Sequence, residues 1–171
     1  MTQKAVNNAK VLYRLNVLRS DVEQAHKIFK KAPFLETLTN PVVSEEAKEA
    51  VLDKIVRQSG LTDLLGNFMK MMCRIGEIGQ ITDIFNCYYK YWDERNHILH
   101  AEVIYVDEET KKEKASILKQ LESIYPKEEI VLSEKTDASL LGGYVVHVGY
   151  EEYDHSYEGK LRRLERKLTG R

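Results

Sequence analysis

The spacing of hydrophobic and polar residues changes once along the chain, after about residue 96. Before that point, apolar residues recur every three or four positions, as in amphipathic α-helices, and caps and breakers separate the stretches. Beyond it, apolar and polar residues alternate over short stretches, as in β-strands. The sequence therefore predicts an α+β protein that is mostly α. A six-helix bundle occupies residues 1–96, and a small α+β domain occupies residues 97–171.

Each helix of the predicted bundle has an apolar side. Ser20 with Glu23 forms a capping box for the second helix, Asn40-Pro41 terminates the short third helix, and Ser44 caps the fourth. Short loops between amphipathic helices imply a compact bundle. The apolar sides consist of Val11, Leu12, Leu15 and Leu18; Val22, Ala25, Ile28 and Phe29; Val51, Leu52, Ile55 and Val56; Leu61, Leu64, Leu65, Phe68, Met72 and Ile75; and Ile81, Ile84, Phe85, Tyr88 and Trp92.

The second domain begins with a predicted strand and continues with a helix. The strand has one face of Leu99, Ala101, Val103 and Tyr105, with more polar residues between them. A charged segment follows, in which Glu108 and Lys112 have a favourable helical spacing. A helix stripe of Ile117, Leu118, Leu121 and Ile124 then ends at Pro126, and residues 129–133 form a second short strand.

The most informative stretch is residues 137–168. Asp137, or Thr136, can accept backbone N–H bonds at the start of a short helical turn. Gly142 and Gly143 then allow a sharp reversal into a strand. One face of this strand carries Tyr144, Val146, Val148 and Tyr150, and the other carries Val145, His147 and Gly149.

A basic amphipathic helix closes the chain. Asp154 and Ser156 are both suitable N-cap residues for it. Residues 158–171 include six basic residues and two acidic ones. This surface is either a solvated face or an electrostatic dock for an acidic helical partner. The apolar stripe is Tyr157, Leu161, Leu164 and Leu168, and the basic residues are Lys160, Arg162, Arg163, Arg166, Lys167 and Arg171.

Composition narrows the function classes. The 26 Lys and Arg residues nearly balance 27 Asp and Glu residues, and a net charge of −1 argues against a general nucleic-acid binder. No apolar run approaches the length of a transmembrane helix, and the N-terminus has no signal-peptide core. Cys73 and Cys87 form neither a disulfide framework nor a metal-binding pair, so we expect buried free thiols.

No catalytic, cofactor or metal site stands out in the sequence. Asp154-His155-Ser156 has the residue types of a catalytic triad, but neighbouring side chains diverge too much to form one. His97 and His100 are expected on opposite faces of a strand, which disfavours a shared metal. A Tyr and Trp cluster near residue 90 is expected to be mainly core, with Tyr88 and Trp92 buried, and no phosphate-binding Gly-rich loop is present.

The C-terminal pattern resembles the signature of the F-type ATP synthase delta subunit, the oligomycin-sensitivity-conferring protein of mitochondria. The family pattern is an Asp, a Leu-Gly-Gly or Ile-Gly-Gly, a strand, Asp-x-Ser and a basic-aliphatic helix. The matching residues are Asp137, Leu141, Gly142, Gly143, Asp154, Ser156, Gly159, Lys160 and Leu161.

The N-terminal part resembles the same family less specifically. Leu38-Thr39-Asn40-Pro41, Lys48, Asn67-Phe68-Met69 and Arg74 correspond to its motifs in order. The first helix departs from the family. It has Asn8-Ala9-Lys10-Val11-Leu12 where the family usually has Tyr-Ala-x-Ala-Leu.

The resemblance implies a non-catalytic stator subunit that supports proton-driven rotary ATP synthesis. Residues 1–96 would bind N-terminal segments of the alpha subunits, and residues 97–171 would bind the b subunits of the peripheral stalk. The protein would lie on the cytoplasmic face of the bacterial cell membrane, peripheral through the complex. It would need no cofactor, bind no nucleic acid and not insert into the membrane.

Two alternatives stay open. One is a generic helical adaptor whose basic last helix binds an acidic protein or nucleic acid. The other is a small metal-dependent enzyme, favoured only by His97, His100 and His147.

Overall fold

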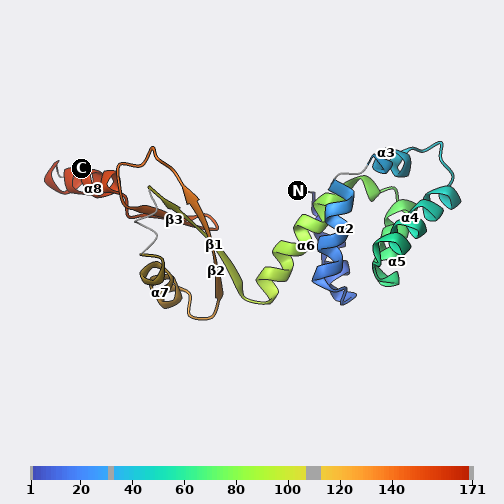
Figure 1. Cartoon of the computed structure of the whole chain (residues 1–171), viewed down its shortest axis with the longest axis horizontal. Helices are drawn as coiled ribbons and strands as arrows, with labels where there is room; N and C mark the ends of the chain where they lie inside the picture. Colours follow the sequence, from blue (N-terminus) through green and yellow to red (C-terminus); the bar gives the residue numbers. More distant parts are fainter. Residues whose placement is uncertain (1, 31–32, 107–112, 170–171) are drawn as a thin grey trace. The chain divides into compact units, whose positions relative to one another are not determined.

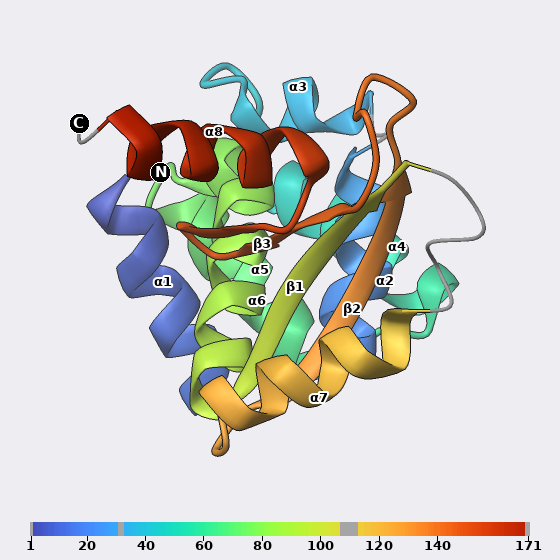
Figure 2. The same cartoon turned by 90° about the vertical axis from the view of Figure 1, so that its left-hand side faces the viewer.

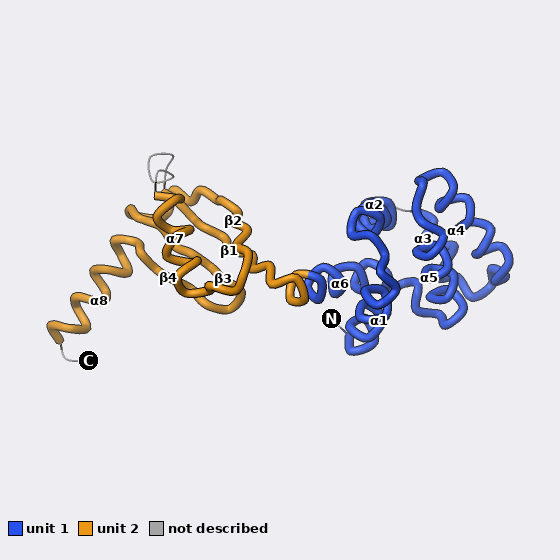
Figure 3. Tube along the Cα trace, turned by 90° about the horizontal axis from the view of Figure 1, so that it is seen from below, with its two compact units in different colours: residues 1–92 blue, residues 93–171 orange. Residues whose placement is uncertain are grey.

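A computed structural model of the chain describes residues 2–30, 33–106 and 113–169. The chain divides into two compact units, Met1–Trp92 and Asp93–Arg171 (Figure 3). This division falls in the last turn of a helix, whereas the predicted boundary lies between that helix and the following strand. The Glu108–Lys112 pair and Arg171 lie outside the described residues. Among the residues described, no helix is long and apolar enough to cross a lipid bilayer.

The first unit is helical throughout its described part (Figure 1). Because the second unit adds a small sheet, the predicted class, α+β and mostly α, is confirmed. The elements of the first unit are α1 (Gln3–Arg14), α2 (Arg19–Lys30), α3 (Phe34–Thr39), α4 (Glu45–Ser59), α5 (Asp63–Arg74), the short 3₁₀ helix η1 (Ile78–Gln80) and α6 (Ile81–Arg95), whose last residues belong to the second unit.

One helix start follows the predicted cap and another does not. Ser44 Oγ accepts a hydrogen bond from the backbone N–H of Ala47 at 3.3 Å, which confirms the cap of α4. The capping box at Ser20 is wrong, because α2 already begins at Arg19. Glu23 instead accepts a hydrogen bond from Arg19 Nε at 3.0 Å.

The apolar side predicted for α1 is also wrong in part. Its buried residues are Ala5, Ala9 and Leu12, which share one helical stripe. Val11 is 40% exposed and Leu15 39% exposed, although both looked like core residues. Two alanines let α1 pack closely against the bundle, and the larger side chains then face outward. Three further residues predicted on apolar sides are exposed: Leu18, which follows α1; Leu64, which lies in α5; and Ile75, which follows α5.

Beyond the end of α6, the described residues of the second unit form a four-stranded sheet and two helices (Figure 2). The strand order is β2-β1-β3-β4; β1 and β2 are parallel, and the other neighbours are antiparallel. Helix α7 makes the crossover that a parallel pair requires. The elements are β1 (Ile98–Tyr105), α7 (Lys114–Ile124), β2 (Glu129–Thr136), β3 (Tyr144–Val148), β4 (Glu151–Asp154) and α8 (Tyr157–Thr169).

The core of this unit lies between one face of the sheet and α7. The register places Val103 opposite Val146 and Tyr105 opposite Tyr144. These side chains are buried together with Ile117 and Leu121 of α7. The alternation predicted for the first strand is therefore confirmed.

The sequence misplaced the end of β3 and missed β4. The strand ends at Val148, Gly149 turns the chain with φ of 60°, and Tyr150 is fully exposed. Glu151 and Glu152 open the following strand, which pairs only with β3. An edge strand that is short and acidic has no apolar alternation to reveal it.

Candidate interaction surfaces

The turn from β4 into α8 brings together several residues of the C-terminal signature. Asp154 Oδ1 accepts hydrogen bonds from Ser156, from its backbone N–H at 2.9 Å and its hydroxyl at 2.6 Å. Ser156 Oγ in turn accepts the N–H of Gly159 at 3.0 Å, which confirms Ser156 as the N-cap of α8. Asp154 therefore positions the capping hydroxyl instead of capping the helix itself. The hydrogen bonds from Ser156 hold the pKa of Asp154 below its usual value.

Close approaches at three glycines complete this turn. A Cβ atom at Gly159 would overlap the Asp154 carboxylate, and one at Gly142 would overlap the ring of Tyr157. Gly143 has φ of 82° and lies against the backbone of His155 and Ser156. We call Gly142, Gly143, Asp154, Ser156 and Gly159 the α8 anchor, because together they fix the start of that helix on the sheet.

Arg163 ties the second turn of α8 back to the same point. Its Nη2 donates to the backbone carbonyl of Asp154 at 2.6 Å, and its Nε donates to that of Gly159 at 3.2 Å. Arg163 therefore adds a second attachment, one turn beyond the α8 anchor.

Two further signature residues, Asp137 and Leu141, lie in the turn between β2 and β3. Asp137 Oδ1 accepts the N–H of Ser139 at 2.9 Å, and its own N–H donates to the carbonyl of Tyr105 at 2.8 Å. The predicted acceptor role is confirmed, although the segment forms a turn and not a helix. The bonds from Ser139 lower the pKa of Asp137. Leu141 is exposed.

Beyond its anchor, α8 is uncovered within the described structure. Gly159 is its only buried residue, and Figures 1 and 3 show the helix extending from the sheet of its own unit. Leu164 is 56% exposed and Leu168 86% exposed, and Tyr157 and Leu161 are exposed as well. Leu164 lines a shallow cavity of about 330 Å³ with Lys160, Arg163 and Lys167. An apolar stripe beside a basic row is thus open to solvent.

The first unit also exposes apolar side chains, on α1 and α5. Val11 and Leu15 lie on one stripe of α1, and Leu64, Met71 and Ile75 lie on one stripe of α5. Asn67 is exposed on the same stripe of α5, whereas Phe68 is buried in the core.

Polar contacts connect α1 to the segment that follows α5. Glu77 binds Lys4 Nζ at 3.0 Å and accepts a hydrogen bond from Asn8 Nδ2 at 2.7 Å. These hydrogen bonds lower the pKa of Glu77. Lys4 and Asn8 share the helical stripe of Val11 and Leu15, so the exposed stripe of α1 continues into these contacts.

Two further N-terminal signature residues, Arg74 and Asn40, make structural contacts. Arg74 Nε donates to Glu49 Oε1 at 2.8 Å, which joins the end of α5 to α4. Asn40 follows α3, and its Oδ1 accepts the N–H of Val42 at 2.9 Å. Pro41 lies between them and is exposed.

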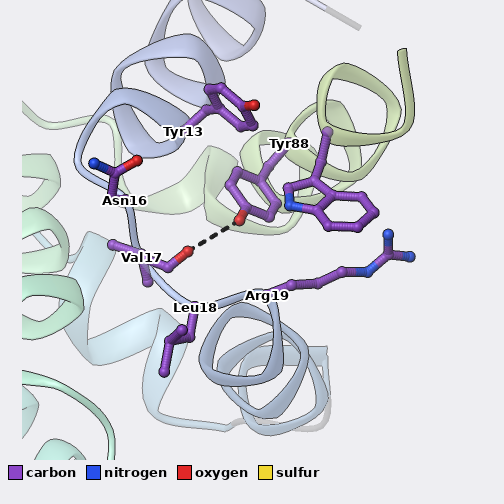
Figure 4. Close-up of a pocket in the computed structure, with 7 residues that line it drawn as sticks. Tyr13, Asn16, Val17, Leu18, Arg19 and Tyr88 are labelled. Carbon is purple, nitrogen blue, oxygen red and sulfur yellow. Dashed lines mark hydrogen bonds between the residues drawn. The ribbon is translucent and has the colours of Figure 1, made fainter. Parts of the chain in front are cut away.

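A cavity of about 280 Å³ lies at the turn between α1 and α2, beside α6 (Figure 4). Tyr88 is buried here, as predicted, and donates a hydrogen bond to the carbonyl of Val17 at 3.2 Å. Burial raises the pKa of Tyr88. The Arg19 guanidinium lies 4.3 Å from the ring centroid of Trp92, which is only partly buried. The sequence did not indicate this stacking, since Arg19 and Trp92 are far apart along the chain.

Among the described residues, the candidate catalytic and metal-binding side chains do not come together in a suitable arrangement. The ring of His155 stacks on Tyr144 with a centroid distance of 5.0 Å, while Ser156 bonds Asp154 directly. His97, with φ of 56°, precedes β1 and contacts Glu128, whereas His100 contacts Asp93 and His147 lies near Glu152. Over the described ranges, no three His, Cys, Asp or Glu side chains gather as metal ligands would.

Comparison with known proteins extends over both units. The model of the family "ATP synthase delta (OSCP) subunit" matches residues 5–168. The ATP synthase subunit delta of Prochlorococcus marinus strain MIT 9515 is 33% identical over 146 residues, covering 85% of this chain and 81% of that protein. The Nostoc punctiforme subunit is 30% identical over 155 residues, covering 91% and 78%.

A solved structure shares the fold. One chain in the cryo-EM structure of the Toxoplasma gondii mitochondrial ATP synthase hexamer aligns with a TM-score of 0.63 and 16% identity, covering 99% of this chain and 98% of that one. The resemblance carried by the two glycines and the Asp-x-Ser turn is therefore confirmed over nearly the whole length. The chain belongs to the ATP synthase delta (OSCP) subunit family.

Proposed function

We propose that this chain links the catalytic head of an ATP synthase to its peripheral stalk through two separate surfaces, one on each unit. As a member of the delta family, the chain is a non-catalytic subunit of the stator. Family membership over residues 5–168 is the observation that carries this proposal. It disfavours a generic adaptor, because the match includes the α8 anchor as well as the helical unit.

The first unit would bind N-terminal segments of the alpha subunits. The exposed stripes of α1 and α5 support this assignment, because an amphipathic helix can bury its own apolar face on such side chains. Val11 and Leu15 offer apolar area on α1, and Met71 and Ile75 offer it on α5. Asn8 stands where the family usually has Tyr. It donates a hydrogen bond to Glu77 and so helps to hold α1, which carries this surface, in place.

A point variant at each stripe tests this surface without removing core residues. Val11→Asp and Met71→Asp should each weaken binding of the alpha N-terminal peptide of the same organism by about tenfold or more, measured by calorimetry. Val42→Asp is the matched control, because Val42 is 89% exposed and lies on neither stripe. Equal binding by all three folded variants would contradict the assignment.

The second unit would bind the b subunits of the peripheral stalk. Truncation after residue 97 should abolish binding of the soluble part of b, whereas the remaining helical unit should still bind the alpha peptide. Circular dichroism of the truncated chain must first show that the helices persist. A truncated chain that retains full binding to b would contradict this division of roles.

The location follows from the partners. As an ATP synthase subunit, the chain is peripheral to the complex, and we propose that it lies on the cytoplasmic face of the bacterial cell membrane. There it would resist rotation of the head, so that proton-driven rotation of the rotor changes the conformation of the catalytic sites. Fractionation that leaves the chain with washed membranes only when the rest of the complex is present tests this location.

A further inference from the structure

The two borders of the apolar stripe on α8 carry opposite charge. Helical periodicity places Lys160 and Lys167 along one border, next to Arg163. It places Glu158 and Glu165 along the other border, where Glu158 forms an ion pair with Arg162 one turn farther on. Arg162 and Arg166 lie farther round, away from the stripe. The excess of basic residues in the sequence of α8 is therefore not spread evenly around the helix.

The basic border also has a surface into which a partner can fit. Lys160, Arg163 and Lys167 line the shallow cavity together with Leu164, at the edge of the stripe. Arg163 is held by the carbonyls of Asp154 and Gly159, and Lys160 lies 5.4 Å from the ring centroid of Tyr157. The carbonyls of the anchor residues Asp154 and Gly159 thus hold Arg163, and the Tyr157 ring lies beside Lys160, before any partner binds. This order lowers the entropic cost of binding.

We propose that α8 docks an amphipathic helix of a partner chain, whose apolar stripe packs on Leu161, Leu164 and Leu168 and whose carboxylates lie along the Lys160–Arg163–Lys167 border. This inference rests on the proposed function, in which the second unit binds the stalk, and it identifies the surface and the chemistry of that partner. Opposite charges on the two borders fix the side on which the partner's acidic row lies, and hence the direction of the bound helix.

The charge pattern favours a protein helix over an anionic membrane or a nucleic acid. Either of those would be attracted to every cationic side chain of α8 and repelled by the acidic border beside the apolar stripe. Only a partner with its own arrangement of charges matches a stripe that is basic on one side and acidic on the other.

Two double variants of the full chain, equal in charge change, test the inference. In Lys160→Glu/Lys167→Glu the basic border is reversed. In Arg162→Glu/Arg166→Glu the reversal lies away from the stripe; it also removes the ion pair between Arg162 and Glu158 and leaves the basic border unchanged. The probe is the soluble part of the b subunit of the same organism, measured by surface plasmon resonance at two salt concentrations. We expect the border variant to lose about tenfold or more in affinity, and the control to stay within about threefold.

A third variant tests the apolar part of the surface. Leu164→Asp should also lose about tenfold or more, with an unchanged circular dichroism spectrum because this side chain is already exposed. Vesicles of phosphatidylglycerol and phosphatidylcholine serve as the second probe, and we expect no sedimentation of the chain with them.

Each contrary result has a distinct meaning. If both double variants lose affinity equally, or if the vesicles bind through α8, the helix attracts partners by unspecific charge and the proposed docking of an amphipathic helix is wrong. If all three variants bind b like the unaltered chain, α8 is not the dock, while the proposed stalk binding survives. Failure of the unaltered chain to bind b overturns the proposed function, and the inference falls with it.

Discussion

The carboxylate of Asp154 occupies the space in which a Cβ atom of residue 159 would lie. Gly159 is the only buried residue of α8, and its N–H donates to the hydroxyl that Asp154 positions. The two residues are therefore coupled by space and by hydrogen bonding. Glycine within a helix usually lowers its stability, so this glycine is explained by the approach of Asp154.

The coupling predicts that Gly159→Ala changes stability in the direction opposite to that expected from helix propensity. In an ordinary exposed helix, Gly→Ala stabilises by about 1 kcal/mol, but Gly159→Ala should destabilise the second unit by about 1–3 kcal/mol because the new methyl group overlaps the carboxylate. Urea unfolding followed by circular dichroism measures the change. In an Asp154→Ala background, the same substitution should be neutral or stabilising, since the overlapping group is absent. Equal destabilisation in both backgrounds would contradict the coupling.

The low pKa of Asp154 predicts a pH dependence. The hydrogen bonds from Ser156 lower this pKa in the folded protein, so the native state binds fewer protons than the unfolded state in the acidic range. The resulting stability is complete above the ordinary Asp pKa of about 3.9 and is lost as pH falls through the native value. Unfolding free energies of the unaltered chain and of Asp154→Asn should therefore differ most above the ordinary Asp pKa of about 3.9 and converge as the pH falls through the native pKa. A difference that does not change with pH would exclude this role.

Leu12 and Leu15 should respond in opposite ways. Leu12 is fully buried, so Leu12→Ala should cost about 2–5 kcal/mol of stability. Leu15 is 39% exposed, so Leu15→Ala should change stability by less than about 1 kcal/mol and instead weaken binding of the alpha peptide. Thermal unfolding and calorimetric titration of both variants provide the comparison. Comparable losses of stability would show that Leu15 belongs to the core after all.

The hydroxyl of Tyr88 should contribute to the turn between α1 and α2. It is buried and donates to the carbonyl of Val17, so Tyr88→Phe leaves that acceptor without this donor and should cost about 1 kcal/mol. Tyr150→Phe is the control, because Tyr150 is fully exposed and should tolerate the change. Chemical denaturation of both variants would reveal the difference, and an unchanged midpoint for Tyr88→Phe would contradict it.

The sequence predicted what local spacing encodes. Leu99, Ala101, Val103 and Tyr105 alternate and do face the core, except that Leu99 is only partly buried. Ser44 and Ser156 cap the helices that they were expected to cap. Caps and alternation depend on residues a few positions apart, which is why they can be read from the chain alone.

Exposed apolar residues could not be separated from core residues by spacing. Val11 and Leu15 on α1, like Leu164 and Leu168 on α8, have the period of a buried stripe, and the structure leaves them exposed. The true core side of α1 contains Ala5 and Ala9, whose small size hides it in a hydrophobicity pattern. A helix with apolar side chains on both a buried and an exposed side has two apolar stripes, and periodicity alone does not show which of them is the core side.

The anchor glycines were found as a pattern, but their cause lies in distant contacts. Gly142 faces the ring of Tyr157, and Gly159 faces Asp154 across the turn from β4. The short acidic strand β4, which the sequence did not indicate, is what brings these groups together. Strand pairing at a sheet edge depends on tertiary contacts. The structural role of the signature residues is therefore seen only in the folded protein.

The proposed linking role requires one chain to hold the alpha N-terminal segment and the peripheral stalk at the same time. Calorimetric titration of the full chain with the alpha peptide, before and after saturation with the soluble part of b, tests it most directly. We predict one-to-one binding of the peptide with the same affinity in both titrations, because the two ligands use separate units. Absence of peptide binding to the folded chain, or displacement of b by the peptide, would contradict a linking role.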